Sequence, residues 1–135
     1  MDAAPPAQVR VLLVDDEPDQ IELYRFGLEP AGFTILEAND GLTAISLARS
    51  ASPDVIVLDL RMPEMDGWQV CAALKADAAT ASIPIVILTA AASLKLGEQA
   101  AHAGCVAYLV KPCYPKDLAR TLRIVVEGTQ PKFGV

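Results

Sequence analysis

The sequence predicts an α/β fold, in which one parallel β-sheet lies between two layers of helices. Two apolar runs, at residues 9–14 and 55–58, contain almost no polar residue, which is typical of strands that are buried on both faces. Segments with strand character alternate with segments of helical periodicity five times along the chain. Short right-handed crossovers between such units produce a single doubly wound sheet.

The length of the chain suits a single domain. A chain of 135 residues can bury roughly two thirds of the surface that it exposes when unfolded, which is enough for one core. We expect this domain at residues 9–128, between a flexible N-terminal tail at 1–8 and a C-terminal tail at 129–135. The first residues lack the basic and apolar parts of a secretory signal, and no apolar run approaches the ~18 residues of a membrane span.

The first unit is a strand at 9–14 followed by a helix. Pro18 stands in the first turn of this helix, where proline is tolerated, and the acidic residues before it favour a helix N-terminus. Apolar residues then recur at helical spacing as far as Leu28. We expect Leu23 and Phe26 to widen this apolar stripe.

The middle units follow the same pattern. A short strand at 33–36 leads into a turn at 39–41, whose residues can cap a helix at 42–50. The apolar strand at 55–58 comes next, and the apolar spacing after it predicts a helix at 68–76.

The last two units complete the alternation. We expect a strand at 85–88 and then a helix at 93–103, although Gly97 lowers the helix propensity of this segment by ~1 kcal/mol relative to alanine. A strand at 105–110 and a helix at 115–127 end the folded part of the chain.

Polar residues capable of chemistry follow four of the predicted strands, at the point where each strand ends. Because the carboxyl ends of parallel strands lie along one edge of a sheet, these side chains converge if the strands are neighbours. They are Asp15, Asp16, Asp59, Thr89 and Lys111. The sequence therefore predicts a site at this edge.

The residue types at this edge point to a metal and to phosphate. Three carboxylates in one crevice repel one another, and a bound hard cation removes that repulsion. Mg²⁺ suits the expected ligands better than Zn²⁺, because all of them are oxygen atoms. A carboxylate beside Mg²⁺ can attack a phosphoryl group and form an aspartyl phosphate. Lys111 would then neutralise the phosphoryl oxygens, and Thr89 would hydrogen-bond one of them.

Composition excludes several other classes of function. The chain has 3 cysteines without CxxC spacing, which argues against a disulfide framework or a zinc site and favours free thiols in a reducing cytoplasm. The 17 acidic and 11 basic residues leave a net charge of −6, which opposes binding to a phosphate backbone. We therefore expect no direct contact with nucleic acid.

Four motifs occur in order along the chain. They are Val-Leu-Leu-Val-Asp-Asp-Glu at 11–17, Met-Pro and Met-Asp-Gly within 59–67, Leu-Thr-Ala at 88–90, and Tyr-Leu-Val-Lys-Pro at 108–112. Each motif is weak alone, but together, over residues 9–127, they resemble the receiver domain of two-component response regulators. The resemblance implies a flavodoxin-like fold, with five parallel strands in the order 2-1-3-4-5.

The resemblance also implies roles around the central aspartate. Asp59 matches the phosphoacceptor, which receives a phosphoryl group from a histidine of a partner kinase or of a phosphotransfer domain. Asp16 matches the direct carboxylate ligand of Mg²⁺, and Asp15 matches the acidic neighbour that reaches the metal through water. Asp59 and the backbone carbonyl of Arg61 match the remaining protein ligands.

The same resemblance assigns the later strand ends. Lys111 matches the lysine that contacts the phosphoryl group, and its peptide bond to Pro112 is expected to be cis. Thr89 and Tyr108 match a switch pair, in which the hydroxyl moves toward the phosphate and the aromatic ring turns inward. This movement remodels the face formed by the fourth helix, the fifth strand and the fifth helix, where an unidentified downstream protein would bind.

Two positions beside the site vary within the family and tune hydrolysis of the aspartyl phosphate. They are occupied here by Arg61 and Ala91. We hypothesise that Arg61 covers the phosphorylated site and that Ala91 offers no side chain to orient water, which would give a long-lived phosphoprotein. Leu94 and Leu96 stand two residues apart in the expected fourth helix, so they cannot both face the core, and the exposed one could serve a partner.

Three other functions remain to be compared with this one. A phosphohydrolase with an aspartyl-phosphate intermediate usually needs a second acid two residues after the nucleophile, and Arg61 stands there instead. A nucleotide-binding module lacks its glycine-rich motifs. A receiver-like scaffold that binds partners without phosphorylation stays open. We expect a phosphoacceptor module rather than an enzyme, and favour a stand-alone regulator over a receiver cut from a longer regulator or hybrid kinase.

Overall fold

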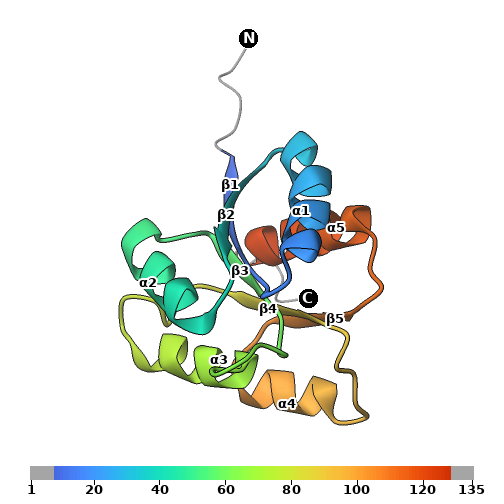
Figure 1. Cartoon of the computed structure of the whole chain (residues 1–135). Helices are drawn as coiled ribbons and strands as arrows, with labels where there is room; N and C mark the ends of the chain where they lie inside the picture. Colours follow the sequence, from blue (N-terminus) through green and yellow to red (C-terminus); the bar gives the residue numbers. More distant parts are fainter. Residues whose placement is uncertain (1–7, 129–135) are drawn as a thin grey trace.

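The computed structural model describes residues 8–128. Within them, five parallel strands form one sheet in the order β2-β1-β3-β4-β5, which confirms the predicted fold class and strand order (Figure 1). The strands are β1 (Val9–Val14), β2 (Phe33–Ala38), β3 (Val55–Leu58), β4 (Ile85–Thr89) and β5 (Ala107–Val110). The tails expected at 1–8 and 129–135 lie outside the described residues, apart from Gln8.

Two layers of helices cover the sheet, with α1 and α5 on one face and α2, α3 and α4 on the other (Figure 1). The helices are α1 (Pro18–Leu28), α2 (Gly41–Ala51), α3 (Gly67–Ala76), α4 (Leu96–His102) and α5 (Pro115–Gly128), with a short 3-10 helix η1 (Glu29–Ala31) after α1. None of the helices between residues 8 and 128 is both long enough and apolar enough to cross a membrane.

The central strand explains why its sequence does not alternate between apolar and polar residues. Ile56 and Leu58 pack into the core under α2, α3 and α4, whereas Val55 and Val57 pack into the core under α1 and α5. All four side chains are buried, because helices cover both faces of β3. The strand that carries Asp59 at its end is therefore held from both sides.

Local signals start the helices on the second face. Asp40 caps α2 by accepting a hydrogen bond from the backbone N–H of Thr43. Asp66 and Gln69 form a reciprocal capping box at the start of α3, in which each side chain accepts a bond from the other residue's backbone N–H. These caps place the N-termini of both helices beside the carboxyl edge of the sheet.

The predicted helix at 93–103 and the predicted strand at 105–110 are longer than the observed elements, α4 (Leu96–His102) and β5 (Ala107–Val110). The helix α4 begins only at Leu96, because the preceding Lys95 has a non-helical backbone. Beyond α4 the backbone N–H of Cys105 bonds to the carbonyl of Ala100, which holds Cys105 against the end of the helix instead of in the sheet. The prediction for the leucine pair is confirmed, since Leu96 is 2% exposed while Leu94 is fully exposed.

The expectation that Leu23 and Phe26 widen the apolar stripe of α1 was wrong. The Phe26 side chain is 79% exposed, and Leu23 is also exposed. The helix packs on the sheet and on α5 through the narrower stripe of Ile21, Tyr24 and Leu28, so the flanking positions face outward. The strand β2 also continues to Ala38, two residues beyond the expected end.

Leu96, the first residue of α4, and Leu94, two residues before it, allow a matched test of how α4 packs on the core. Leu96→Ala is expected to lower the free energy of unfolding by about 2–5 kcal/mol, because it leaves a cavity beneath α4. Leu94→Ala is expected to change it by less than about 0.5 kcal/mol, because this side chain lies on the surface. Urea denaturation monitored by circular dichroism measures both values. Equal losses of stability in the two variants would contradict the finding that Leu96 is buried and Leu94 is exposed.

Candidate functional site

The parallel hydrogen bonding of the sheet continues past the strand ends and aligns the residues that follow them. The backbone N–H of Asp59 bonds to the carbonyl of Val14 at 3.1 Å, and that of Lys111 bonds to the carbonyl of Thr89 at 2.9 Å. Asp15 is likewise bonded through its N–H to Ala38. These bonds bring the polar residues of four strand ends to one edge, as the sequence predicted.

Three carboxylates meet at this edge. Asp15, Asp16 and Asp59 each offer a ligand atom, and these atoms lie within 4.8 Å of one another. Asp15 is 4% exposed and Asp59 is 8% exposed, whereas Asp16 is less completely buried. This cluster, hereafter the acidic cluster, concentrates negative charge where little water can screen it.

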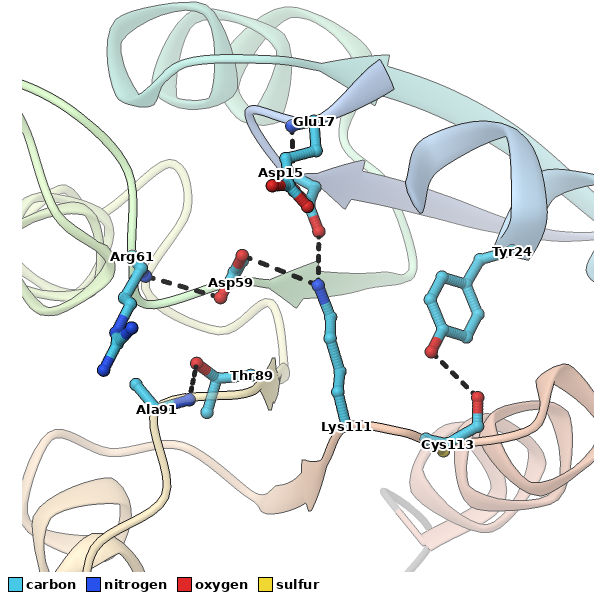
Figure 2. Close-up of polar contacts among 9 residues, drawn as sticks. All are labelled: Asp15, Glu17, Tyr24, Asp59, Arg61, Thr89, Ala91, Lys111 and Cys113. Carbon is cyan, nitrogen blue, oxygen red and sulfur yellow. Dashed lines mark hydrogen bonds and ion pairs between the residues drawn. The ribbon is translucent and has the colours of Figure 1, made fainter. Parts of the chain in front are cut away.

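Lys111 supplies a positive charge to the acidic cluster. Its Nζ donates a hydrogen bond to Asp15 Oδ2 at 2.7 Å and lies 3.6 Å from Asp59 Oδ2 (Figure 2). Burial lowers the pKa of Lys111, but the bond to Asp15 and the charge of Asp59 outweigh it and raise this pKa above its usual value. The lysine therefore stays protonated beside the two aspartates.

The groups around Asp59 shift its pKa in opposite directions. Burial raises the pKa of Asp59, and the charge of Asp15 adds to that effect, whereas Lys111 and the backbone N–H of Arg61 lower it. The net shift is upward. The Arg61 N–H donates to Asp59 Oδ1 at 3.3 Å, which fixes the orientation of the carboxylate (Figure 2).

Thr89 lies beside the acidic cluster with its side chain buried. Its Oγ1 accepts a hydrogen bond from the backbone N–H of Ala91 at 3.0 Å (Figure 2). Tyr108 is not part of the cluster. It pairs with Ile87 on the neighbouring strand, is 47% exposed, and lies against Gly97 of α4, where an added Cβ would approach its ring to 3.3 Å.

The acidic cluster opens to solvent through two grooves. One has a volume of about 870 Å³ and extends from Asp59 and Lys111 toward Tyr24 and Leu23 of α1. The other has a volume of about 560 Å³ and extends toward Trp68, Ala91 and Gln99. Arg61, whose side chain is exposed, lines both grooves. A reactant can therefore reach Asp59 from outside, past Arg61.

The loop after Lys111 is held by a contact that the sequence analysis missed. The peptide bond from Lys111 to Pro112 is cis, the isomer that the resemblance implied. The buried Tyr24 of α1 donates from its hydroxyl to the carbonyl of Cys113 at 2.8 Å (Figure 2). A tyrosine at a core-facing helix position was the available signal, because a buried phenol needs a hydrogen-bond partner.

The fold and this edge are those of a receiver domain. The model of the response regulator receiver domain family matches residues 11–123, and the chain belongs to this family of two-component systems. It is 34% identical over 119 residues to Protein PilH of Pseudomonas aeruginosa, covering 88% of this chain and 98% of PilH. The solved structure of the chemotaxis protein CheY4 of Vibrio cholerae has a TM-score of 0.83 and 33% identity, and the match covers 88% of this chain and 99% of CheY4.

Other relatives are longer proteins. The chain is 36% identical over 120 residues to the DNA-binding dual master transcriptional regulator RpaA of Synechocystis sp., covering 89% of this chain and 50% of RpaA. The chain thus spans about half the length of several curated relatives that it matches.

The raised pKa of Asp59 predicts a pH-dependent effect of Asp59→Asn in metal-free buffer. Because ionisation of Asp59 is harder in the folded protein, the wild type loses stability as the pH rises from below the usual carboxyl pKa (~3.9) through the raised value. Asparagine does not ionise, so the variant does not lose stability in this pH range. Urea unfolding should show the variant to be more stable by about 1 kcal/mol at pH 7, with a smaller gain at low pH.

The exposed Glu22 of α1 provides the control, because Glu22→Gln also removes one negative charge. It should leave stability unchanged within about 0.5 kcal/mol. An Asp59→Asn protein less stable than the wild type at pH 7 would mean that Lys111 more than offsets the burial of Asp59.

Proposed function

We propose that the chain is a response-regulator receiver that accepts a phosphoryl group on Asp59 from a histidine kinase or a histidine phosphotransfer domain. The observation that carries this proposal is the position of Asp59. It lies at the end of a doubly covered strand, within the acidic cluster, 3.6 Å from the Lys111 ammonium and at the base of an open groove. The chain would thus act as a phosphoacceptor in signalling and not as an enzyme on a separate substrate.

The acidic cluster fits Mg²⁺. The negative charge of its three carboxylates is larger than the single positive charge of Lys111 beside them. Its ligand atoms are oxygen, and no histidine or cysteine among residues 8–128 belongs to it. Asp16 would bind the ion directly, Asp15 through water, and Asp59 and the Arg61 carbonyl would complete the protein ligands. When bound, the ion supplies positive charge opposite the phosphoryl oxygens.

The chain's own residues account for the rest of the transfer. A carboxylate oxygen of Asp59 attacks the phosphorus, while the phosphorus–nitrogen bond of the donor breaks and its electron pair stays with the imidazole. Lys111 lowers the pKa of Asp59 against the effect of burial, which favours the ionised form that makes this attack. Its ammonium then meets the phosphoryl oxygens, and the Thr89 hydroxyl turns from Ala91 toward one of them.

The response to phosphorylation would appear on the face formed by α4, β5 and α5. Thr89 and Tyr108 lie on adjacent strands, so a shift of the hydroxyl toward the phosphoryl group makes room for the aromatic ring to turn inward. Tyr108 is now half exposed and rests on Gly97 of the short helix α4, so its rotation would alter that helix contact. A downstream protein would recognise the altered face.

The proposed receiver domain occupies residues 9–128, which is supported by the start of β1 at Val9 and the end of α5 at Gly128. The relatives named as DNA-binding are about twice as long as the matched region. With its net charge of −6, this chain is proposed to act through protein partners and not through direct contact with nucleic acid. The cytoplasmic location stays a prediction.

Intact-mass measurement with phosphoramidate, a small phosphodonor, tests the proposal. The wild type should gain one phosphoryl group in the presence of Mg²⁺ and none after chelation, and Asp59→Asn should gain none. Asp54→Asn is the matched control, because Asp54 lies at the opposite end of the same strand and its side chain is exposed. It should be phosphorylated like the wild type. No gain under any condition would favour a scaffold that works without phosphorylation.

The lifetime of the phosphoprotein tests the proposed role of Arg61. Its exposed side chain lines both grooves, and the neighbouring Ala91 presents no group that orients water. Arg61→Ala is expected to shorten the half-life of the aspartyl phosphate by ~3-fold or more, because water then enters freely. Arg120→Ala, which removes an exposed arginine of α5, should leave the half-life unchanged. An unaltered half-life in Arg61→Ala would exclude the covering role.

A further inference from the structure

Two of the three cysteines lie side by side in the core between the sheet and the helices α3 and α4. Cys71, on α3, is fully buried, and Cys105, between α4 and β5, is partly exposed. They are 34 residues apart in sequence, yet their Sγ atoms are 3.5 Å apart. Both are free thiols, as is Cys113, whose Sγ contacts the carbonyl of Tyr114 at 3.6 Å.

We infer that Cys71 and Cys105 form a reversible intramolecular disulfide when the protein meets a peroxide. The sulfur atoms are already in contact, so the pair needs no rearrangement of the fold to react. Nothing in the proposed phosphoryl transfer uses these residues, and the inference stands independently of it.

The pair contains one thiol suited to react first and one suited to follow. The hydrogen bond between the two sulfur atoms, together with the nearby Lys75, holds the pKa of Cys105 below the usual thiol value despite its burial. The same bond and burial raise the pKa of Cys71. The partly exposed Cys105 is therefore the thiolate that a peroxide can reach, and the buried Cys71 is the thiol that then reacts with the oxidised Cys105.

The reaction balances in two steps. The Cys105 thiolate attacks one peroxide oxygen, the oxygen–oxygen bond breaks, and hydroxide leaves and takes up a proton, which gives a sulfenic acid and water. The Cys71 sulfur then attacks the Cys105 sulfur, the sulfur–oxygen bond breaks, and hydroxide leaves with the Cys71 proton as a second water. Each sulfur is oxidised by one electron, the peroxide is reduced by two, and a dithiol reverses the product.

The backbone around Cys105 permits closure of the bond. Moving the sulfur atoms from 3.5 Å to a disulfide separation of about 2.05 Å requires a shift of about 1.5 Å. Cys105 belongs to neither α4 nor β5, and it follows Gly104, which has a positive φ of 86°. The shift can therefore be shared between the two side chains and this connecting segment. The product would fasten α3 to the junction of α4 and β5.

Treatment of the full chain with hydrogen peroxide tests the inference, with Cys113→Ser as the background that removes the third thiol. The expected product has lost two hydrogen atoms, contains a Cys71–Cys105 cross-linked peptide in non-reducing digests, and returns to the starting mass with dithiothreitol. Its melting temperature should exceed that of the reduced form, because the closed loop restricts the unfolded chain.

The single variants distinguish a paired reaction from ordinary oxidation. In Cys71→Ser, Cys105 lacks its partner and should instead accumulate sulfinic and sulfonic acid that dithiothreitol does not reverse. In Cys105→Ser, the buried Cys71 should stay reduced. If Cys71→Ser does not fold, the Cys113→Ser protein still decides the question. Oxygen addition at Cys105 without a cross-link, a cross-link through Cys113 in the wild type in place of the pair, or no reaction would each overturn the inference.

Discussion

The ion pair between Lys111 and Asp15 is the interaction on which the site depends. It joins residues 96 positions apart, which directly follow β1 and β5, across the carboxyl edge of the sheet. Three carboxylates sit at this edge and two of them are almost completely buried, so removing the ammonium would leave uncompensated charge in a poorly solvated place. The order of the strands matters because it places the ends of β1, β3, β4 and β5 in succession along one edge, where the Lys111 side chain reaches both Asp15 and Asp59.

The centre of the sheet is packed tightly on both faces, whereas several residues at its carboxyl edge are less tightly held. Helices cover both faces of β3, and its side chains are fixed by two separate cores. Residues at and beside the strand ends are less constrained: the Arg61 side chain is exposed, the Thr89 Oγ1 accepts a hydrogen bond from the backbone of Ala91, and Tyr108 rests on a helix of two turns. Such an arrangement fixes the Asp59 carboxylate, and under the proposed function its neighbours would move when a phosphoryl group is added there.

Membership in the receiver family connects this chain to proteins of two kinds. PilH and CheY4 are matched over nearly their whole length, whereas RpaA is matched over about half of its length. The family match at residues 11–123 includes the carboxyl edge of the sheet with the acidic cluster.

The sequence by itself determined the strands and the residues of the acidic cluster. Uninterrupted apolar runs and the polar residues that end them are local features, and parallel strands share a carboxyl edge whatever helices cover them. Only the tertiary structure decided that Phe26 faces outward, that Tyr24 holds the carbonyl of Cys113, and that Cys71 touches Cys105. Each of these depends on which element packs against which, and on contacts between residues far apart in the chain, which local periodicity does not encode.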